Sequence, residues 1–112
     1  MNKFGFFPEN SEVAFQSHLI GLEVRTRGLL LDLRVFIKSL GNNVIEEIRP
    51  HRIANAKSLN FRTFVDIQPK NDSLIISIRR GRTYPLVTRT VRDSSELKAI
   101  GQQIAEAYET IK

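Results

Sequence analysis

The stretch that decides the fold reads Phe61-Arg62-Thr63-Phe64-Val65-Asp66-Ile67-Gln68, then Pro69-Lys70-Asn71-Asp72, then Ser73-Leu74-Ile75-Ile76-Ser77-Ile78. In both outer parts apolar residues alternate with period two, which is typical of a β-strand with one buried face. The middle part consists of residues that favour turns. Two alternating runs joined by a short turn predict a β-hairpin.

Period two also assigns the side chains of this hairpin to its two faces. The apolar set is expected to point inward, and it comprises Phe61, Val65, Ile67, Leu74, Ile76 and Ile78. The other set is expected to point outward, and it comprises Arg62, Phe64, Asp66, Gln68, Ile75, Ser77 and Arg79. The outward set mixes arginine with an aromatic and a β-branched residue.

The hairpin is flanked by further extended segments. Pro50 argues against one uninterrupted central strand over residues 44–56, so we expect an extended segment near 45–49 and a strand near 51–56. Residues 81–85 predict a turn, and residues 86–92 predict another strand. Arg89 is placed with the outward set, although Val87 and Val91 share its parity and a bulge would exchange the faces.

Helical patterns lie on both sides of the strands. Residues 23–40 predict the main helix, with Gly41 as its C-cap and an apolar stripe made of Leu29, Leu33, Phe36 and Leu40, flanked by Leu30 and Ile37. Asp93, three residues before Glu96, predicts the N-cap of a last helix whose apolar positions are Leu97, Ile100, Ile104, Tyr108 and Ile111. Ser11 predicts the cap of a short first helix that ends near Gly21.

These elements predict an α+β two-layer sandwich in the order α-α-β-β-β-β-α. An antiparallel sheet of approximately four strands carries both long helices on one face. We expect Leu33, Phe36, Val65, Ile76, Ile104 and Tyr108 to share one core. Residues 1–10 are expected to form an N-terminal arm and residues 11–112 a single domain. Phe4, Phe6 and Phe7 of the arm are expected to dock on the domain or on a second copy.

Composition excludes several classes of protein. The chain has 112 residues, of which 41% are hydrophobic and 26% charged, as in an ordinary single domain. It has no cysteine, which excludes a disulfide scaffold, a zinc finger and a thiol nucleophile. The apolar runs are too short to cross a membrane. The segment around Phe4 is too short and interrupted for a signal peptide, so a cytoplasmic location is expected.

Charge gives the best functional indication. Seventeen Lys and Arg against twelve Asp and Glu leave a net charge of +5, which favours encounters with polyanions. Arginines beside an aromatic ring on an open sheet suit single-stranded nucleic acid, since bases stack while arginines hold phosphates. The candidate contacts are Arg62, Phe64, Arg79, Arg80, Arg82 and Arg89. The alternatives are that Phe64 packs beneath the arm or a dimer partner and that the arginine-rich turn is simply solvated.

Catalytic patterns are absent. The sequence has no phosphate-binding loop, dinucleotide fingerprint or nucleophile elbow. Glu47 and His51 would share a helix face as metal ligands, but Pro50 argues against a helix there. His18 has no evident catalytic partner. Asp66 and Lys70 give a weak nuclease-like pair, which would need further carboxylates. No cofactor or metal is expected.

Two segments resemble a known family. The residues Leu33-Arg34-Val35-Phe36-Ile37-Lys38-Ser39-Leu40-Gly41-Asn42-Asn43-Val44 and the stretch from Phe61 to Lys70 are similar to an uncharacterised prokaryotic domain family, some of whose members are labelled "predicted transport protein". The resemblance covers roughly residues 12–111 and departs from the family around Arg49 to Lys57, where aromatic residues are common in the family. It implies the same α+β sandwich. Family members fused to nuclease-like or DNA-modifying proteins imply an accessory binding role.

The sequence thus predicts a small non-enzymatic binding module, with single-stranded nucleic acid as the first candidate ligand. The alternative is a protein-interaction or homo-oligomerisation domain, present as a monomer or homodimer. A nuclease-type enzyme fragment is the third hypothesis.

Overall fold

The computed structural model describes residues 14–58, 62–81 and 83–111. A helical turn over residues 14–17 comes first. The elements that follow are α2 (Val24–Lys38), β1 (Val44–Ile48), β2 (Ile53–Lys57), β3 (Arg62–Lys70), β4 (Ser73–Ile78), β5 (Val87–Val91) and α3 (Ser94–Thr110). The predicted N-terminal arm with its three phenylalanines, the cap at Ser11, Phe61 and Arg82 lie outside the described residues.

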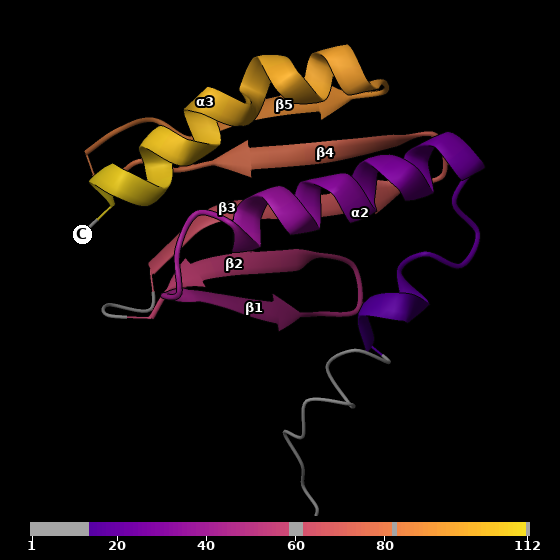
Figure 1. Cartoon of the computed structure of the whole chain (residues 1–112), viewed down its shortest axis with the longest axis horizontal. Coiled ribbons are helices and arrows are strands. Elements are labelled where there is room, and N and C mark those ends of the chain that lie inside the picture. The colour runs from indigo at the N-terminus through magenta and orange to yellow at the C-terminus, as the bar shows by residue number, and fades with distance from the viewer. Residues whose placement is uncertain (1–13, 59–61, 82, 112) are drawn as a thin grey trace, which may run out of the picture.

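The strands form one antiparallel meander in the order β1-β2-β3-β4-β5 (Figure 1). The predicted hairpin is β3–β4, in which Lys70 pairs with Ser73 across a tight turn. The prediction of four strands was wrong, because residues 44–48 are a full strand of this five-stranded sheet. Pro50 lies in the turn between β1 and β2, where it needs no ladder hydrogen bond, and Arg49 N–H donates to the Arg52 carbonyl at 2.9 Å beside it.

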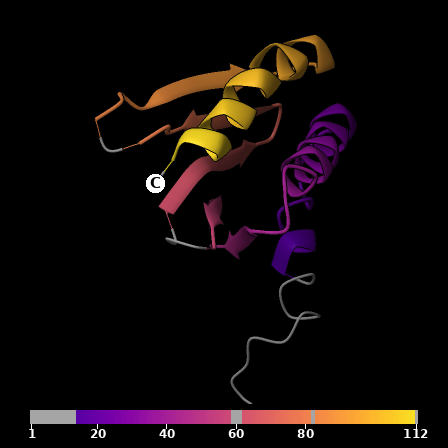
Figure 2. The ribbon, with the colours of Figure 1, turned by 60° about the vertical axis from the view of Figure 1, so that its left-hand side comes forward.

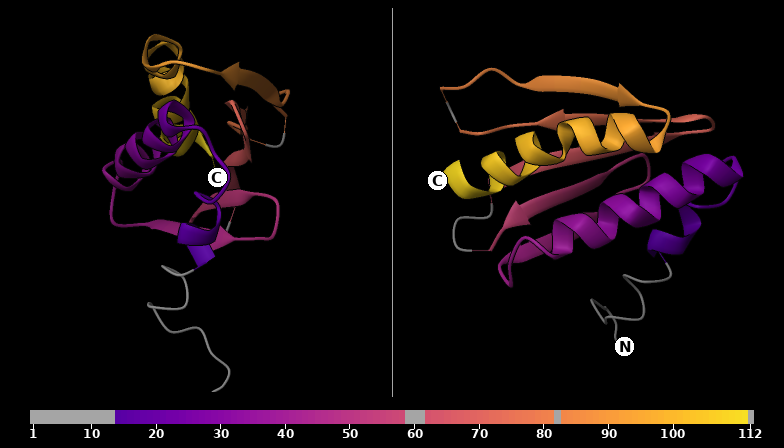
Figure 3. Two further views of the ribbon diagram at one scale, coloured as in Figure 1. Left: turned by 90° about the vertical axis from the view of Figure 1, so that its right-hand side faces the viewer. Right: turned by 45° about the horizontal axis from the view of Figure 1, so that its top comes forward.

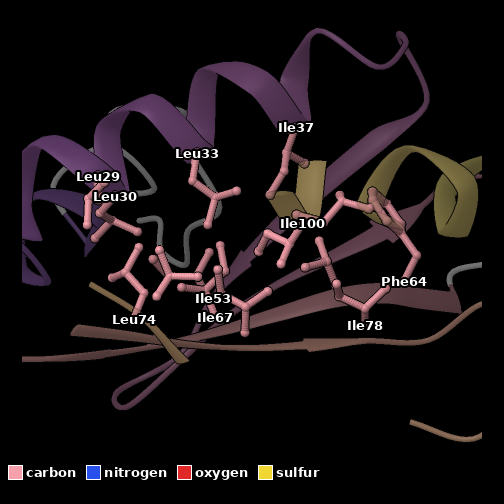
Figure 4. Packing of buried hydrophobic residues seen from close by; sticks show 14 of the residues in the cluster. Leu29, Leu30, Leu33, Ile37, Ile53, Phe64, Ile67, Leu74, Ile78 and Ile100 are labelled. Carbon is pink, nitrogen blue, oxygen red and sulfur yellow. The ribbon is translucent and has the colours of Figure 1, made fainter. Parts of the chain in front are cut away.

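Both long helices lie on the same face of the sheet, as predicted, and among the described residues no helix covers the other face, which we call the uncovered face (Figures 2 and 3). α2 crosses above the central strands and α3 runs beside it. Leucines and isoleucines of α2 point toward β2, β3 and β4, with Ile100 of α3 joining them (Figure 4). The predicted core residues Leu33, Val65, Ile76, Ile104 and Tyr108 all belong to this cluster.

Phe36 is the exception in the predicted core. The buried residues of α2 are Thr26, Leu29, Leu30, Leu33 and Ile37. This buried stripe is centred to one side of the predicted one, so Phe36 falls on its flank and keeps 36% of its surface exposed. Its ring points toward α3, where a Cβ added to Gly101 would lie 3.7 Å away.

The ends of the two helices are built differently. The carboxylate of Asp93 accepts a hydrogen bond from Glu96 N–H at 2.9 Å, which confirms the predicted N-cap of α3. Gly41 is not the C-cap of α2, because that role belongs to Ser39. Gly41 instead lies against the hydroxyl of Tyr108, and no side chain would fit there. A glycine at this position lets the chain after α2 pass close to α3.

Candidate functional site

The uncovered face of the sheet was the predicted binding surface. Strand register places on it Ile45, Glu47, Ala54, Ala56, Thr63, Asp66, Gln68, Ile75, Ser77, Thr88 and Thr90. These side chains are small, polar or β-branched, and none of the described strands adds an aromatic ring on this side. Its charges are partly paired, since Arg52 Nη1 lies 3.0 Å from Asp66 Oδ2 and Arg49 Nη2 lies 3.4 Å from Glu47 Oε1. The face therefore lacks a platform on which bases would stack.

Phe64 does not point outward. Val65 pairs with Asn55 and Thr63 with Ala56, so Phe64 is an extra residue in a β-bulge. The bulge places Phe64 and Val65 on the helix side together, and both are fully buried. The ring of Phe64 meets that of Tyr108 edge-on, with centroids 5.4 Å apart and planes at 71°. Its role is to anchor α3 to the sheet.

Arg89 also lies on the helix side. It pairs with Ile76, which is buried under the helices, and β5 continues this register without a bulge. β5 is an edge strand that α3 covers only in part, so Arg89 stays exposed there. It lines a hollow of about 180 Å³ together with Gln103 and Glu106 of α3. The expectation that it joins the outward set was wrong for this reason.

The other predicted arginines that the structure describes are Arg62, Arg79 and Arg80. Arg62 pairs with Lys57 on the helix side, because the bulge at Phe64 shifts the phase of the strand, so the expectation that Arg62 points outward was wrong. Arg62 and Arg79 nevertheless line the same depression of about 280 Å³, together with Gly81 and Ile111. Arg80 points elsewhere, since its guanidinium lies 4.6 Å from the centroid of the Tyr84 ring. Among the described candidates, the structure thus brings together two pairs in two different hollows, Arg62 with Arg79 and Arg80 with Arg89.

A surface that the sequence reasoning missed lies on the outer side of α2. We call Val24, Gly28, Leu31 and Val35 the outer stripe of α2, because their spacings of four, three and four residues place them on one helix face. Val24 is 81% exposed, Val35 is 70% exposed and Leu31 is 39% exposed. Nothing lies within 4 Å of a Cβ added to Gly28. The signal was present in the sequence as a second apolar stripe on the side of residues 24–37 opposite to the buried one.

An apolar groove runs beside the outer stripe, between α2 and α3. It has a volume of about 490 Å³, and its apolar walls are formed by Leu33, Phe36, Leu97, Ile104 and Ala105, with Gly101 between them. Asp32 and Lys98 stand at its rim. The outer stripe and the groove together make one side of the helical layer unusually apolar for a surface.

The flank of α2 that carries Arg34 and Lys38 is held to β1 by ion pairs. Arg34 donates two hydrogen bonds to the carboxylate of Glu46, at 3.0 and 2.8 Å, and its guanidinium stacks 3.8 Å from the centroid of the Phe15 ring. Lys38 Nζ lies 3.6 Å from the same carboxylate. Paired, partly buried arginine–carboxylate contacts of this kind fix geometry. The orientation of α2, and hence of its outer stripe, is therefore set by its own fold.

Among the described residues, the polar side chains that the sequence offers for catalysis are not assembled into a site. Histidine 18 contacts the carbonyl of Arg49 through Nε2 at 2.7 Å. Asp66 is paired with Arg52, as described above. Within residues 14–58, 62–81 and 83–111, three or more His, Cys, Asp or Glu side chains do not come together as a metal site would require.

Comparisons of the chain with protein-family models, with curated proteins and with solved structures returned no match. The resemblance noted from the sequence therefore stays a prediction. Across the part of the chain that the structure describes, no helix combines the length and the apolar content needed to cross a membrane.

Proposed function

We propose that the chain is a non-enzymatic protein-interaction module whose contact surface is the outer stripe of α2. The observation that supports this function is the exposure of Val24, Leu31 and Val35 on a helix whose opposite face is already packed. Single exposed apolar residues are ordinary, whereas an apolar stripe beside an apolar groove is typical of a docking surface.

The spacing of the stripe favours a helical partner. Apolar residues that alternate by three and four positions are the pattern by which one helix packs along another. Gly28, in the middle, presents no side chain, which favours close approach of a partner residue. The ion pair of Arg34 with Glu46 holds α2 before any partner arrives, so binding would not require the helix to be ordered first.

Photocrosslinking in cells that express the chain tests this function. A benzoylphenylalanine at Val35 is expected to give discrete crosslinked species, and an additional Leu31→Glu substitution is expected to remove them. The matched control carries the same probe at Glu109, which is exposed on α3 and lines neither the stripe nor the groove. Absence of any crosslink at Val35, to this chain or to another protein, would contradict the proposed function.

A second candidate function, binding of single-stranded nucleic acid, is favoured by the shared depression of Arg62 and Arg79. We expect phosphate contacts to dominate, with affinity on the order of micromolar or weaker and a steep loss with salt. Arg79→Ala should weaken binding of mixed-sequence strands and flatten the salt dependence, since phosphates carry no sequence information. Arg89→Ala is the control, because Arg89 lines a different hollow from Arg62 and Arg79. No binding in a low-salt titration would exclude this candidate.

A further inference from the structure

We propose that the occupant of the outer stripe is a second copy of this chain, with the two α2 helices antiparallel across a twofold axis between Gly28 and Leu31. This inference rests on the proposed function and names its partner. Three observations on the described residues support this arrangement. They are the symmetric spacing of the stripe, the opposite charges of Arg25 and Asp32 beside it, and the pairing of Arg34 with Glu46 within one chain.

The stripe is self-complementary only when one helix is reversed. Its spacings of four, three and four read the same in both directions, so reversal superposes the stripe on itself. Val24 then meets the partner's Val35, and Leu31 meets the partner's Gly28. The leucine side chain enters the open space above the glycine, as a knob enters a hole. A parallel pair would instead set glycine against glycine and leave a void between the helices.

The charges along one flank also fit the antiparallel arrangement. Arg25 and Asp32 lie seven residues apart on the side of the stripe that faces α3. In antiparallel helix pairs, residues of the same flank face one another. Arg25 therefore faces the partner's Asp32, and the twofold axis forms this contact twice. Asp32 is exposed and has no ion pair among the described residues, so its carboxylate is available for this contact.

The other flank would bring Arg27 toward the partner's Arg34. Repulsion there is limited because Arg34 is committed within its own chain. Its guanidinium binds both carboxylate oxygens of Glu46, and its side chain is only 15% exposed. The charge of Arg34 is thus compensated before the two copies meet.

Sedimentation of the full chain over a range of concentrations tests the dimer. We expect a concentration-dependent shift to twice the monomer mass. Leu31→Glu should raise the dissociation constant by about 30-fold or more, since a central truncated contact in an interface is commonly worth about 2 kcal/mol. Val35→Glu should act in the same direction, and both variants should keep the far-ultraviolet circular dichroism of the wild type. Leu86→Glu is the matched control, because Leu86 is 50% exposed and lies away from α2.

Charge reversal tests the orientation. Asp32→Arg alone should weaken the dimer about 10-fold, because it places two arginines together, and adding Arg25→Asp should restore it. In a parallel pair Asp32 would face the partner's Arg27 instead, so rescue by Arg27→Asp and not by Arg25→Asp would overturn the antiparallel arrangement. A chain that stays monomeric at every concentration would overturn the dimer. If the Val35 crosslink to another protein persists in that case, the proposed function stands and only this inference fails.

Discussion

The two long helices share one layer and one sheet face, yet their outer surfaces differ. α3 buries Ile100, Ile104, Ala107 and Tyr108 and turns mainly polar side chains to solvent, among them Lys98, Gln102, Glu106 and Glu109. α2 buries a similar stripe but turns the apolar outer stripe to solvent. α3 is a typical amphipathic helix, whereas α2 is apolar on two opposite sides.

This difference between the helices distinguishes apolar residues that stabilise the fold from apolar residues that are free to bind a partner. The large buried residues of α3 pack in the core of the chain, so the pattern of this helix is explained mainly by the fold of one chain. The outer residues of α2 are not explained in that way, since they contribute nothing to the core. We infer that α2 carries both a packing face and a recognition face, and each prediction below acts on one side of this comparison.

Phe64→Ala should have the largest effect on stability. The ring is fully buried and packs edge-on against Tyr108, so its removal leaves a cavity where α3 meets the sheet. We expect the free energy of unfolding to fall by about 3–5 kcal/mol, measured by urea denaturation. A loss below about 1 kcal/mol would contradict the assignment of Phe64 to the core, because burial of a phenylalanine is worth more than that.

The case of Phe64 also shows what could be predicted from sequence. Alternation located the β3–β4 hairpin and its inward residues Ile67, Leu74 and Ile76 correctly. Alternation does not report a bulge, however, because one inserted residue shifts the phase without changing the composition. The adjacent apolar pair of Phe64 and Val65 was the only local sign of it.

Pro50 and α2 show two other limits of sequence reasoning. A proline excludes a central strand position but is equally compatible with a hairpin turn, so the number of strands depended on pairing that only the fold defines. On α2, apolar residues occur on two opposite sides, so the sequence pattern does not determine which side is buried. Leu30 and Ile37, beside the predicted stripe, are buried, while Phe36 within it is half exposed. The outer stripe was missed for the same reason.

Two neighbouring leucines of α2 provide the next test. Leu30 is fully buried and Leu31 is 39% exposed on the opposite side. Leu30→Ala should destabilise the fold by about 2–5 kcal/mol, whereas Leu31→Ala should change stability by about 0.5 kcal/mol or less at concentrations where the chain is monomeric. Equal losses in thermal or urea unfolding would mean that α2 does not have separate packing and recognition faces.

Two glycines provide the next comparison: Gly41 follows α2, and Gly101 lies within α3. A side chain at Gly41 would collide with the Tyr108 hydroxyl, so Gly41→Ala should cost about 1–3 kcal/mol through overpacking. Gly101→Ala is the control, because its Cβ would only touch the Phe36 ring at 3.7 Å. A helical alanine there should instead stabilise α3 by about 0.5–1 kcal/mol. The same sign of change for both variants in urea unfolding would contradict this packing.

The smallest expected effect on stability concerns the N-terminal cap of α3. Asp93 caps α3 with its side chain, whereas Glu23 makes no side-chain cap hydrogen bond at the start of α2. The Glu96 N–H, and after it the Ser95 hydroxyl, hydrogen-bond the carboxylate of Asp93 and lower its pKa below the ordinary value of 3.8. A lowered pKa in the folded state means that the charged form stabilises the fold above pH 3.8, and that this contribution is lost as the pH falls through the folded pKa.

Asp93→Asn keeps a capping oxygen but removes the titration. The stability difference between wild type and Asp93→Asn should therefore favour the wild type at neutral pH and shrink as the solution is acidified. A stability difference for Asp93→Asn that is constant from neutral to acidic pH would refute the electrostatic role of the cap.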